Sequence, residues 1–282
     1  MIAPRPRVRK RRWPRRLLLT ALALALLAGA ALFQGLVVRT YQVKSAKLDS
    51  GAEIRLVVLT DLHGAVYGER QEPIVRRVAQ LRPDAICLVG DMVDDRVSPE
   101  GTRVLLEQIA GLAPTFYVTG SHEYWSPERE QIVPMFTHYG VTVLQGQTVS
   151  VTLNGQRVAF SGLNDPVYTP NYGYDVLLRP FENLDSDAFH ILLSHRPDPI
   201  ETFAQYGFDL VLSGHTHGGQ VRVPFLLNGL YAPDQGWFPP YAGGLYQVGG
   251  SALVVSRGLS YDPQLPRVFN PPEIVLVRVT GP

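Results

Sequence analysis

The chain has 282 residues, of which 45% are hydrophobic, so it is long enough to bury a substantial core in one large domain or two small ones. It contains a single cysteine, Cys87, which excludes an intramolecular disulfide and therefore a disulfide-stabilised scaffold. Eight of the 26 basic residues lie within residues 1–16, where there is no acidic residue. The rest of the chain has 18 basic and 25 acidic residues, a net charge of −7, and no basic stripe, which disfavours nucleic acid as a partner.

An uncharged apolar run follows this basic arm. Residues 17–38, LLLTALALALLAGAALFQGLVV, contain no charged residue over 22 positions. At 1.5 Å per residue, a helix of this length spans the roughly 30 Å hydrocarbon core of a bilayer. The pattern therefore predicts a single-pass transmembrane anchor. The positive-inside rule keeps the arm, residues 1–16, in the cytoplasm and places the domain at the cell membrane on the extracytoplasmic side.

A cleavable signal peptide is the competing interpretation of the same run. Ala28-Gly29-Ala30 has the small residues that a signal peptidase accepts. The apolar run continues eight residues beyond this site, which favours an uncleaved anchor. Residues 39–53 are polar and are interpreted as a short linker.

From residue 54 onward the pattern is that of alternating strands and helices. Asn154-Gly155 lies between two alternating runs, which is a strong short-range signal for a β-hairpin. The other expected strands are runs of β-branched and aliphatic residues that end in Gly, Asp or His. The predicted strands cover residues 54–60, 85–89, 115–119, 141–145, 158–162, 189–194, 208–213, 252–256 and 273–279.

Three helices are predicted between the early strands. Apolar residues recur at helical spacing over 71–81 and over 101–110. A third helix is expected to begin at Ser126-Pro127, an N-cap followed by proline, and Pro134 is expected to bend or end it. Strand-helix alternation followed by a β-rich second half predicts an α/β fold in which two mixed β-sheets pack as a sandwich with flanking helices.

Candidate metal ligands follow five of the predicted strands. Ligand sites in open α/β sheets collect at the carboxyl ends of strands, and five of the seven histidines lie at such ends. Imidazole and carboxylate ligands without thiolates suit Mn, Fe or Zn, and a carboxylate can bridge two ions about 3.5–4 Å apart. The candidates are Asp61 and His63 in TDLHG, Asp91 and Asp94 in GDMVDD, His122 and Glu123 in GSHEYW, His195 in LLSHRPD, and His215 and His217 in LSGHTHGG.

Each group taken singly also has a structural interpretation. Asp61, His63 or Asp91 could cap a turn, and Asp94 and Asp95 could belong to a solvated loop. His195, followed by Arg-Pro, could begin a helix. The groups together favour a metal site, because five strand ends would otherwise have acquired such residues independently.

The order and spacing of these groups resemble the calcineurin-like metallophosphoesterase family. The family pattern, D-x-H, G-D-x-x-D, G-N-H-[DE], H and G-H-x-H, occurs here as DLH, GDMVD, GSHE, SH and GHTH. GHTHGGQVRVPF and the closing VVSRGL…FNPPEIVLVRV further resemble its membrane-anchored bacterial subgroup. The resemblance implies a metallophosphatase-like domain of α/β/β/α layers over residues 54–282. It also implies two divalent metal ions, one held by Asp61, His63 and His217 and the other by His195 and His215, with Asp91 bridging.

The resemblance also implies roles around these ligands. His122, oriented by Glu123, would be the general acid beside the leaving-group oxygen, and Asp94 would support the ligands. Ser121 departs from the pattern, because the family has an asparagine there whose amide oxygen completes the second metal ion. A serine hydroxyl is shorter and a weaker donor, so the second ion is expected to be held weakly.

The implied activity is hydrolysis of a phosphodiester, phosphomonoester or pyrophosphate bond by a hydroxide that the two metal ions activate. With a membrane anchor, the expected substrate is a phosphorylated lipid or cell-envelope component. Two loops rich in aromatic residues, 164–175 and 231–244, could wall a groove for such a substrate or cover sheet edges. The alternative is a metal-poor protein of the same fold that Ser121 has inactivated and that binds a phosphate ligand.

Overall fold

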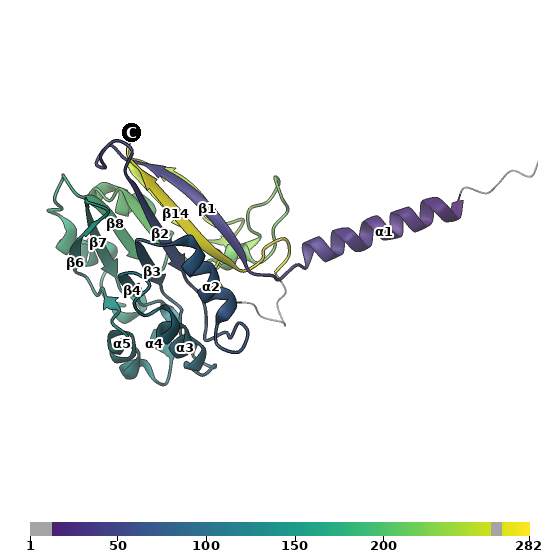
Figure 1. The fold of residues 1–282 in the computed structure, drawn as a ribbon, viewed down its shortest axis with the longest axis horizontal. Coiled ribbons are helices and arrows are strands. Elements are labelled where there is room, and N and C mark those ends of the chain that lie inside the picture. The colour runs from purple at the N-terminus through teal and green to yellow at the C-terminus, as the bar shows by residue number, and fades with distance from the viewer. Residues whose placement is uncertain (1–12, 261–266) are drawn as a thin grey trace, which may run out of the picture.

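The computed structural model describes residues 13–260 and 267–282, and Figure 1 shows how they are arranged. Two six-stranded sheets pack face to face around one apolar core, and helices cover their outer faces. Both sheets contain parallel and antiparallel pairs. The predicted α/β fold with two mixed sheets is therefore confirmed.

The first sheet has the strand order β1-β14-β2-β3-β4-β5. β14 runs antiparallel to β2, while β2, β3, β4 and β5 are parallel neighbours, so their carboxyl ends lie at one edge. The strands are β1 (Val37–Lys44), β2 (Glu53–Leu59), β3 (Ala85–Val89), β4 (Thr115–Val118), β5 (Thr142–Val143) and β14 (Glu273–Thr280).

The second sheet has the order β12-β13-β9-β8-β7-β6, with β13, β9, β8 and β7 parallel. β6 and β7 form the predicted hairpin, with Asn154 and Gly155 both at positive φ in its turn. The strands are β6 (Thr148–Leu153), β7 (Gln156–Leu163), β8 (Phe189–Ser194), β9 (Leu210–Ser213), β12 (Gly244–Val248) and β13 (Ser251–Val255). A separate short hairpin consists of β10 (Tyr231–Ala232) and β11 (Gly236–Trp237).

Side-chain alternation along the strands divides the core into layers. In β2, Leu56 and Val58 pack between the sheets, whereas Val57 and Leu59 face the helices. This strand is apolar on both faces, as expected for a strand in the parallel part of a sheet that is covered on both sides. Helices α2 (Glu72–Leu81), α3 (Glu100–Ile109) and α5 (Arg129–His138) cover the first sheet, and the short α6 (Tyr174–Leu177) and α7 (Ile200–Phe203) cover the second.

The third predicted helix differs from expectation at both ends. It begins at Arg129 rather than at Ser126, and it continues through Pro134 to His138. Buried Ile132 and Phe136 hold this helix on the sheet, so the lost backbone hydrogen bond at Pro134 does not end it. A further short helix, α4 (Ser121–Trp125), follows β4 and is not among the predicted helices.

The N-terminal helix α1 (Trp13–Ala31) projects away from the two sheets (Figure 1). Across the part of the chain that the structure describes, no helix is both long and apolar enough to cross a membrane. The predicted transmembrane helix over 17–38 is therefore not supported. The helix ends at Ala31, and the last residues of the predicted span enter β1. The basic arm lies almost wholly outside the described residues.

The predicted linker, 39–53, is also corrected by the structure. Most of β1 lies within it, and β1 pairs in parallel with β14 over eight residues, from Val37 opposite Glu273 to Lys44 opposite Thr280. The sequence does not indicate this edge strand, because many of its side chains are polar and exposed and its strand conformation depends on backbone pairing with a distant segment.

Candidate metal centre

Five of the seven residues expected to hold or bridge metal have a positive backbone φ. The seven are Asp61, His63, Asp91, Ser121, His195, His215 and His217. Residues other than glycine rarely adopt positive φ, because the Cβ atom then approaches the backbone. Such conformations persist where the surrounding structure holds them, and they concentrate at functional sites. Here φ is 50° at Asp61, 50° at His63, 50° at Asp91, 71° at His215 and 47° at His217.

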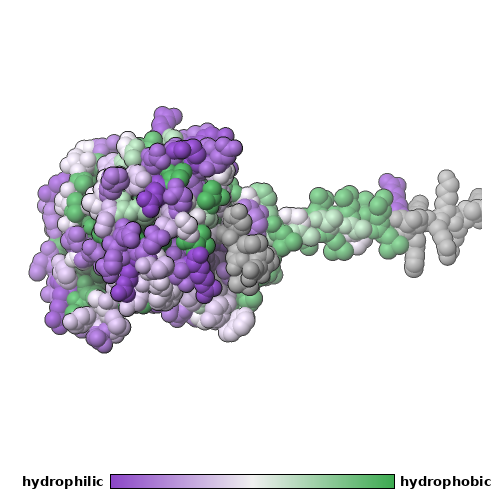
Figure 2. Space-filling view, turned by 90° about the horizontal axis from the view of Figure 1, so that it is seen from below, coloured by the Kyte–Doolittle hydropathy of each residue, from purple (hydrophilic) through white to green (hydrophobic). Residues whose placement is uncertain are grey.

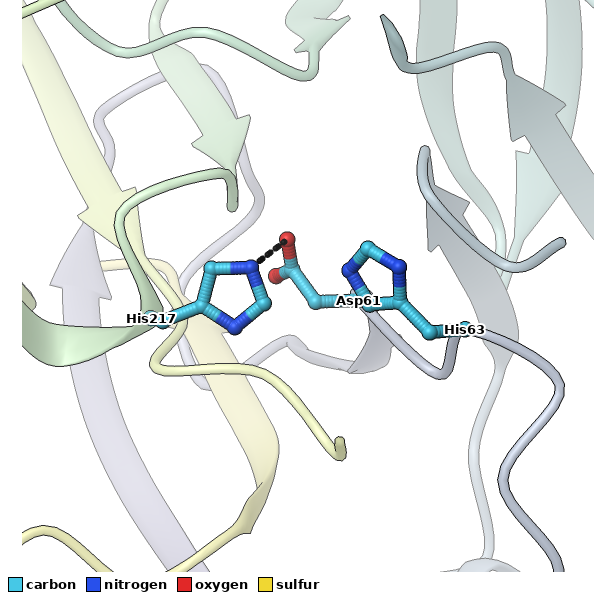
Figure 3. Close-up of side chains that lie close together, drawn as sticks. All are labelled: Asp61, His63 and His217. Carbon is cyan, nitrogen blue, oxygen red and sulfur yellow. Dashed lines mark ion pairs between the residues drawn. The ribbon is translucent and has the colours of Figure 1, made fainter. Parts of the chain in front are cut away.

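The first cluster contains Asp61, His63 and His217. Each offers one ligand atom, and these atoms lie within 4.8 Å of one another. Figure 3 shows the Asp61 carboxylate between the two imidazole rings, with Nε2 of His217 at 3.7 Å from Oδ1 of Asp61. Two hydrogen bonds fix the buried Asp61 carboxylate. Oδ1 accepts from the backbone N–H of His215 at 3.0 Å, and Oδ2 accepts from the Thr60 hydroxyl at 2.9 Å.

The second cluster contains Asp91, His195 and His215, all buried and again with ligand atoms within 4.8 Å. Nδ1 of His195 lies 2.8 Å from the carbonyl oxygen of Val89. A carbonyl only accepts, so Nδ1 carries the proton and Nε2 points into the cluster. Nε2 lies 3.0 Å from Oδ2 of Asp91 but has no hydrogen-bond partner.

Asp91 connects the two clusters. Its Oδ2 is 3.0 Å from Nε2 of His195 and 3.8 Å from Nε2 of His63, one histidine nitrogen from each cluster. Both nitrogens are buried without a hydrogen-bond partner, which is costly unless something else binds there. Two unpartnered imidazole nitrogens around a shared carboxylate fit a pair of divalent cations.

The electrostatics around His63 and His195 favour positive charge, whereas burial lowers the pKa of His217 to about 3. Burial opposes protonation of His195, but the Asp91 carboxylate outweighs it and raises the pKa of His195 to about 10. Burial likewise opposes protonation of His63, and the carboxylates around it raise the pKa of that ring above its usual value. An environment of this kind attracts a cation, and a bound metal ion would take the place of the protons.

Asp94 lies behind the first cluster. Its Oδ2 is 2.9 Å from Nδ1 of His63, which leaves Nε2 of that ring free on the other side. Burial tends to raise the pKa of Asp94, but the His63 hydrogen bond, the backbone N–H of Arg96 and the nearby histidines together outweigh it and lower the pKa to about 2. The structure therefore places Asp94 where it can orient a ligand.

The expected pairing of His122 with Glu123 is wrong. Glu123 is buried, and both of its oxygens accept backbone N–H bonds. Oε2 accepts from Asp91 at 2.9 Å and Gly120 at 2.8 Å, and Oε1 accepts from Met92 at 2.7 Å and Val93 at 3.0 Å. Glu123 thus fastens the loop after β3 to the start of α4. Burial and Asp91 raise its pKa to about 7, against the effect of these N–H donors.

The His122 ring is oriented instead by Asp95. Nδ1 of His122 is 2.8 Å from Oδ1 of Asp95 and 3.5 Å from Oδ2 of Asp94. The ring lies 4.5 Å from that of His63, and its side chain is partly exposed. The sequence alone suggested that Asp95, the last aspartate of GDMVDD, belongs to a solvated loop, and its adjacency to Asp94 was the available signal.

Ser121 is buried at the start of α4, between two residues that touch Asp91. The backbone N–H of His122 donates to Oδ1 of Asp91 at 2.9 Å. A Cβ on Gly120 would lie 2.2 Å from the same oxygen, so only glycine allows the chain to pass this close. The structure brings Ser121 to the side of the bridging carboxylate, and its role as a weak ligand stays a prediction.

Sequence reasoning also missed Asp234. Oδ2 of Asp234 is 2.7 Å from Nε2 of His215, and the same oxygen is 2.5 Å from Nη1 of Arg196. Asp234 lies in the turn between β10 and β11, and neither its spacing from GHTH nor its type distinguishes it in the sequence.

Comparisons with known proteins identify the family. The family of calcineurin-like phosphoesterases matches residues 54–219. An uncharacterized metallophosphoesterase of Aquifex aeolicus is 30% identical over 254 residues, which cover 86% of this chain and 92% of the relative. The chain belongs to this family.

The chain is accordingly a metallophosphoesterase, a hydrolase that acts on phosphoester bonds. A Bos taurus transmembrane protein with a metallophosphoesterase domain is 30% identical over 228 residues, covering 74% of this chain and about half (49%) of the relative. Among solved structures, the phosphopantetheinyl hydrolase of Mycobacterium tuberculosis superposes with a TM-score of 0.47 at 15% identity, over 73% of this chain and 89% of that protein.

Proposed function

We propose that the chain hydrolyses a phosphodiester, phosphomonoester or pyrophosphate bond with two divalent cations, Mn, Fe or Zn, bound at the two clusters. The observation that carries this proposal is the position of Asp91, whose Oδ2 faces an unpartnered histidine nitrogen from each cluster. Asp61, His63 and His217 would hold one cation and His195 and His215 the other, with Asp91 shared. When bound, such cations neutralise phosphoryl oxygens and make water a nucleophile near neutral pH.

The protein's own groups would position and protonate the reacting atoms. Asp94 holds the His63 ring, and the Val89 carbonyl holds the His195 ring. His122, held by Asp95 through Nδ1, has Nε2 available to donate a proton to the leaving-group oxygen. Glu123 supports this arrangement by holding the loops of Asp91 and Ser121 together.

We further propose a place for the protein at the extracytoplasmic side of the cell membrane, as a member of a membrane-anchored bacterial subgroup with a lipid or envelope substrate. Figure 2 shows α1 as a hydrophobic rod outside the domain. An exposed apolar surface of this extent marks a contact with lipid or with another protein. A relative described as a transmembrane protein also supports the proposal. The exposed leucines of α1 are Leu17, Leu18, Leu19, Leu22, Leu24, Leu26 and Leu27.

Location is tested by fractionation of cells that express the full chain. We expect it in the membrane fraction, and we expect added protease to digest the domain in spheroplasts with an intact inner membrane. Recovery of the full chain in the soluble fraction, or protection from protease until the cells are lysed, would contradict this part of the proposal.

Activity is tested with the full chain purified in detergent and stripped with a chelator. A chromogenic phosphodiester, the corresponding monoester and inorganic pyrophosphate are offered in turn with Mn²⁺, Fe²⁺ or Zn²⁺. We expect turnover of at least one bond type only after a metal is returned. A protein that binds phosphate tightly but turns over none of the three would instead support the metal-poor binding protein.

A further inference from the structure

The turn of the β10–β11 hairpin presents one charged side chain to the metal centre. Ala232 pairs with Gly236, so the turn consists of the three residues between them. Its central residue, Asp234, has φ of 59°. Aspartate and asparagine tolerate this region better than most residues, and the turn therefore fixes the direction in which Asp234 projects.

The contact between Asp234 and His215 determines which ring nitrogen is free. Oδ2 of Asp234 lies 2.7 Å from Nε2 of His215. An ionised carboxylate only accepts hydrogen bonds, so Nε2 carries a proton and Nδ1 is the ring nitrogen left to bind a cation. The ring is nearly buried, whereas the Asp234 side chain is 40% exposed, so the contact lies at the rim of the site.

Arg196 holds Asp234 in place. Its Nη1 bonds Oδ2 of Asp234 at 2.5 Å, and its Nε and Nη2 bond both oxygens of Asp165 at 2.7 and 2.9 Å. Asp165 is buried, and this bidentate ion pair fixes the plane of the Arg196 guanidinium. A chain of charged contacts thus runs from Asp165 through Arg196 and Asp234 to His215.

We propose that Asp234 is the positioning residue of the His195/His215 metal site and that it links this site to the β10–β11 hairpin. The inference rests on the proposed function, because the ligand that it concerns is a divalent cation. Asp234 presents Nδ1 of His215 to the cation and restrains the ring. The same hairpin exposes Tyr231 and Trp237, whose rings are 5.4 Å apart. A molecule bound to these two rings would therefore contact the hairpin that also carries Asp234.

Metal affinity of an Asp234→Asn variant tests the proposal. Asparagine keeps the shape and tolerates the backbone conformation but lacks the negative charge. In Mn²⁺ calorimetry of the chelator-stripped full chain, we expect the affinity of one site to fall by about 10–100-fold and that of the other to change by less than about threefold. Asp187→Asn, a change at an exposed loop aspartate, is the matched control and is expected to leave both affinities unchanged.

Two readouts separate this inference from the proposed function. Wild-type protein that binds no Mn²⁺ would overturn the proposed function, whereas normal wild-type binding with unchanged affinities in Asp234→Asn would overturn this inference alone. The ¹⁵N shifts of His215 in the metal-free wild-type chain give a second test that needs no variant. We expect the proton on Nε2, and a proton on Nδ1 alone would contradict the proposed role of Asp234.

Discussion

Oδ2 of Asp91 lies 3.0 Å from Nε2 of His195, and that nitrogen has no hydrogen-bond partner. Because Nδ1 of the ring is bonded to the Val89 carbonyl, Nε2 is the atom left to bind something positive beside the carboxylate. Oδ2 also faces Nε2 of His63 at 3.8 Å. The shared oxygen is the physical basis for proposing two cations rather than one.

Asp91→Ala should abolish activity. The change removes the bridging carboxylate and leaves His195 and His63 without their shared anionic neighbour. Loss of a residue that supports a metal ligand lowers metal affinity or activity by about 10–100-fold. We therefore expect loss of the bridging carboxylate to lower kcat/KM by more than about 100-fold. Steady-state hydrolysis and metal analysis of the same samples measure this. Activity within tenfold of wild type, with Asp187→Ala as the exposed control, would contradict a bridging role.

His122→Ala should keep its metal ions and lose rate. General acid catalysis contributes about 10²–10⁴-fold, and the loss should be greatest for esters with a poor leaving group. Asp95→Asn should show the same dependence on leaving group with a smaller loss, because Asp95 acts through the His122 ring. A series of aryl and alkyl phosphodiesters measures both. Equal losses across the series would mean that His122 is not the acid.

Ser121→Asn should strengthen the weaker metal site. The longer amide reaches further than the hydroxyl and is a better ligand, so the Mn²⁺ concentration for half-maximal rate should fall. A shift of about tenfold corresponds to about 1.4 kcal/mol of binding free energy. Metal titrations of rate and heat in wild type and variant measure it. Two tightly held ions in the wild type, with no gain in the variant, would show that another group already completes the site.

Glu123→Gln should destabilise the fold near the site. Both oxygens of Glu123 accept two backbone N–H bonds, so an amide nitrogen at either position would face two donors. Hydrogen bonds to a charged group contribute about 1.5–3 kcal/mol each, and we expect the free energy of unfolding to fall by about 3 kcal/mol. Chemical denaturation compares the variant with Glu130→Gln, which alters an exposed side chain. Equal stability of the two variants would refute the bracing role.

The sequence identified the strand ends that converge, because parallel strands bring their carboxyl ends to one edge whatever the loops do. It predicted the groups at Asp61, Asp91, His195 and His215 for that reason. It could not predict which carboxylate faces which ring. Asp95 contacts His122 in place of Glu123, because His122 in the short α4 helix lies against the loop after β3.

Contacts between segments that are distant in the chain could not be predicted from the sequence either. Asp234 reaches His215 through a tight hairpin turn whose residues carry no ligand pattern. β1 is polar along its exposed side and becomes a strand only by pairing with β14, more than 200 residues away in the chain. The helix α1 ends at Ala31, and β1 begins six residues later.

Anomalous diffraction from crystals of the full chain grown with saturating Mn²⁺ would locate the bound cations directly. We expect two peaks about 3.5–4 Å apart on either side of the Asp91 carboxylate. The peak beside His195 and His215 should be the weaker one, because Ser121 stands where the family has asparagine. A single peak, or two peaks that do not share Asp91, would contradict the two-cation mechanism.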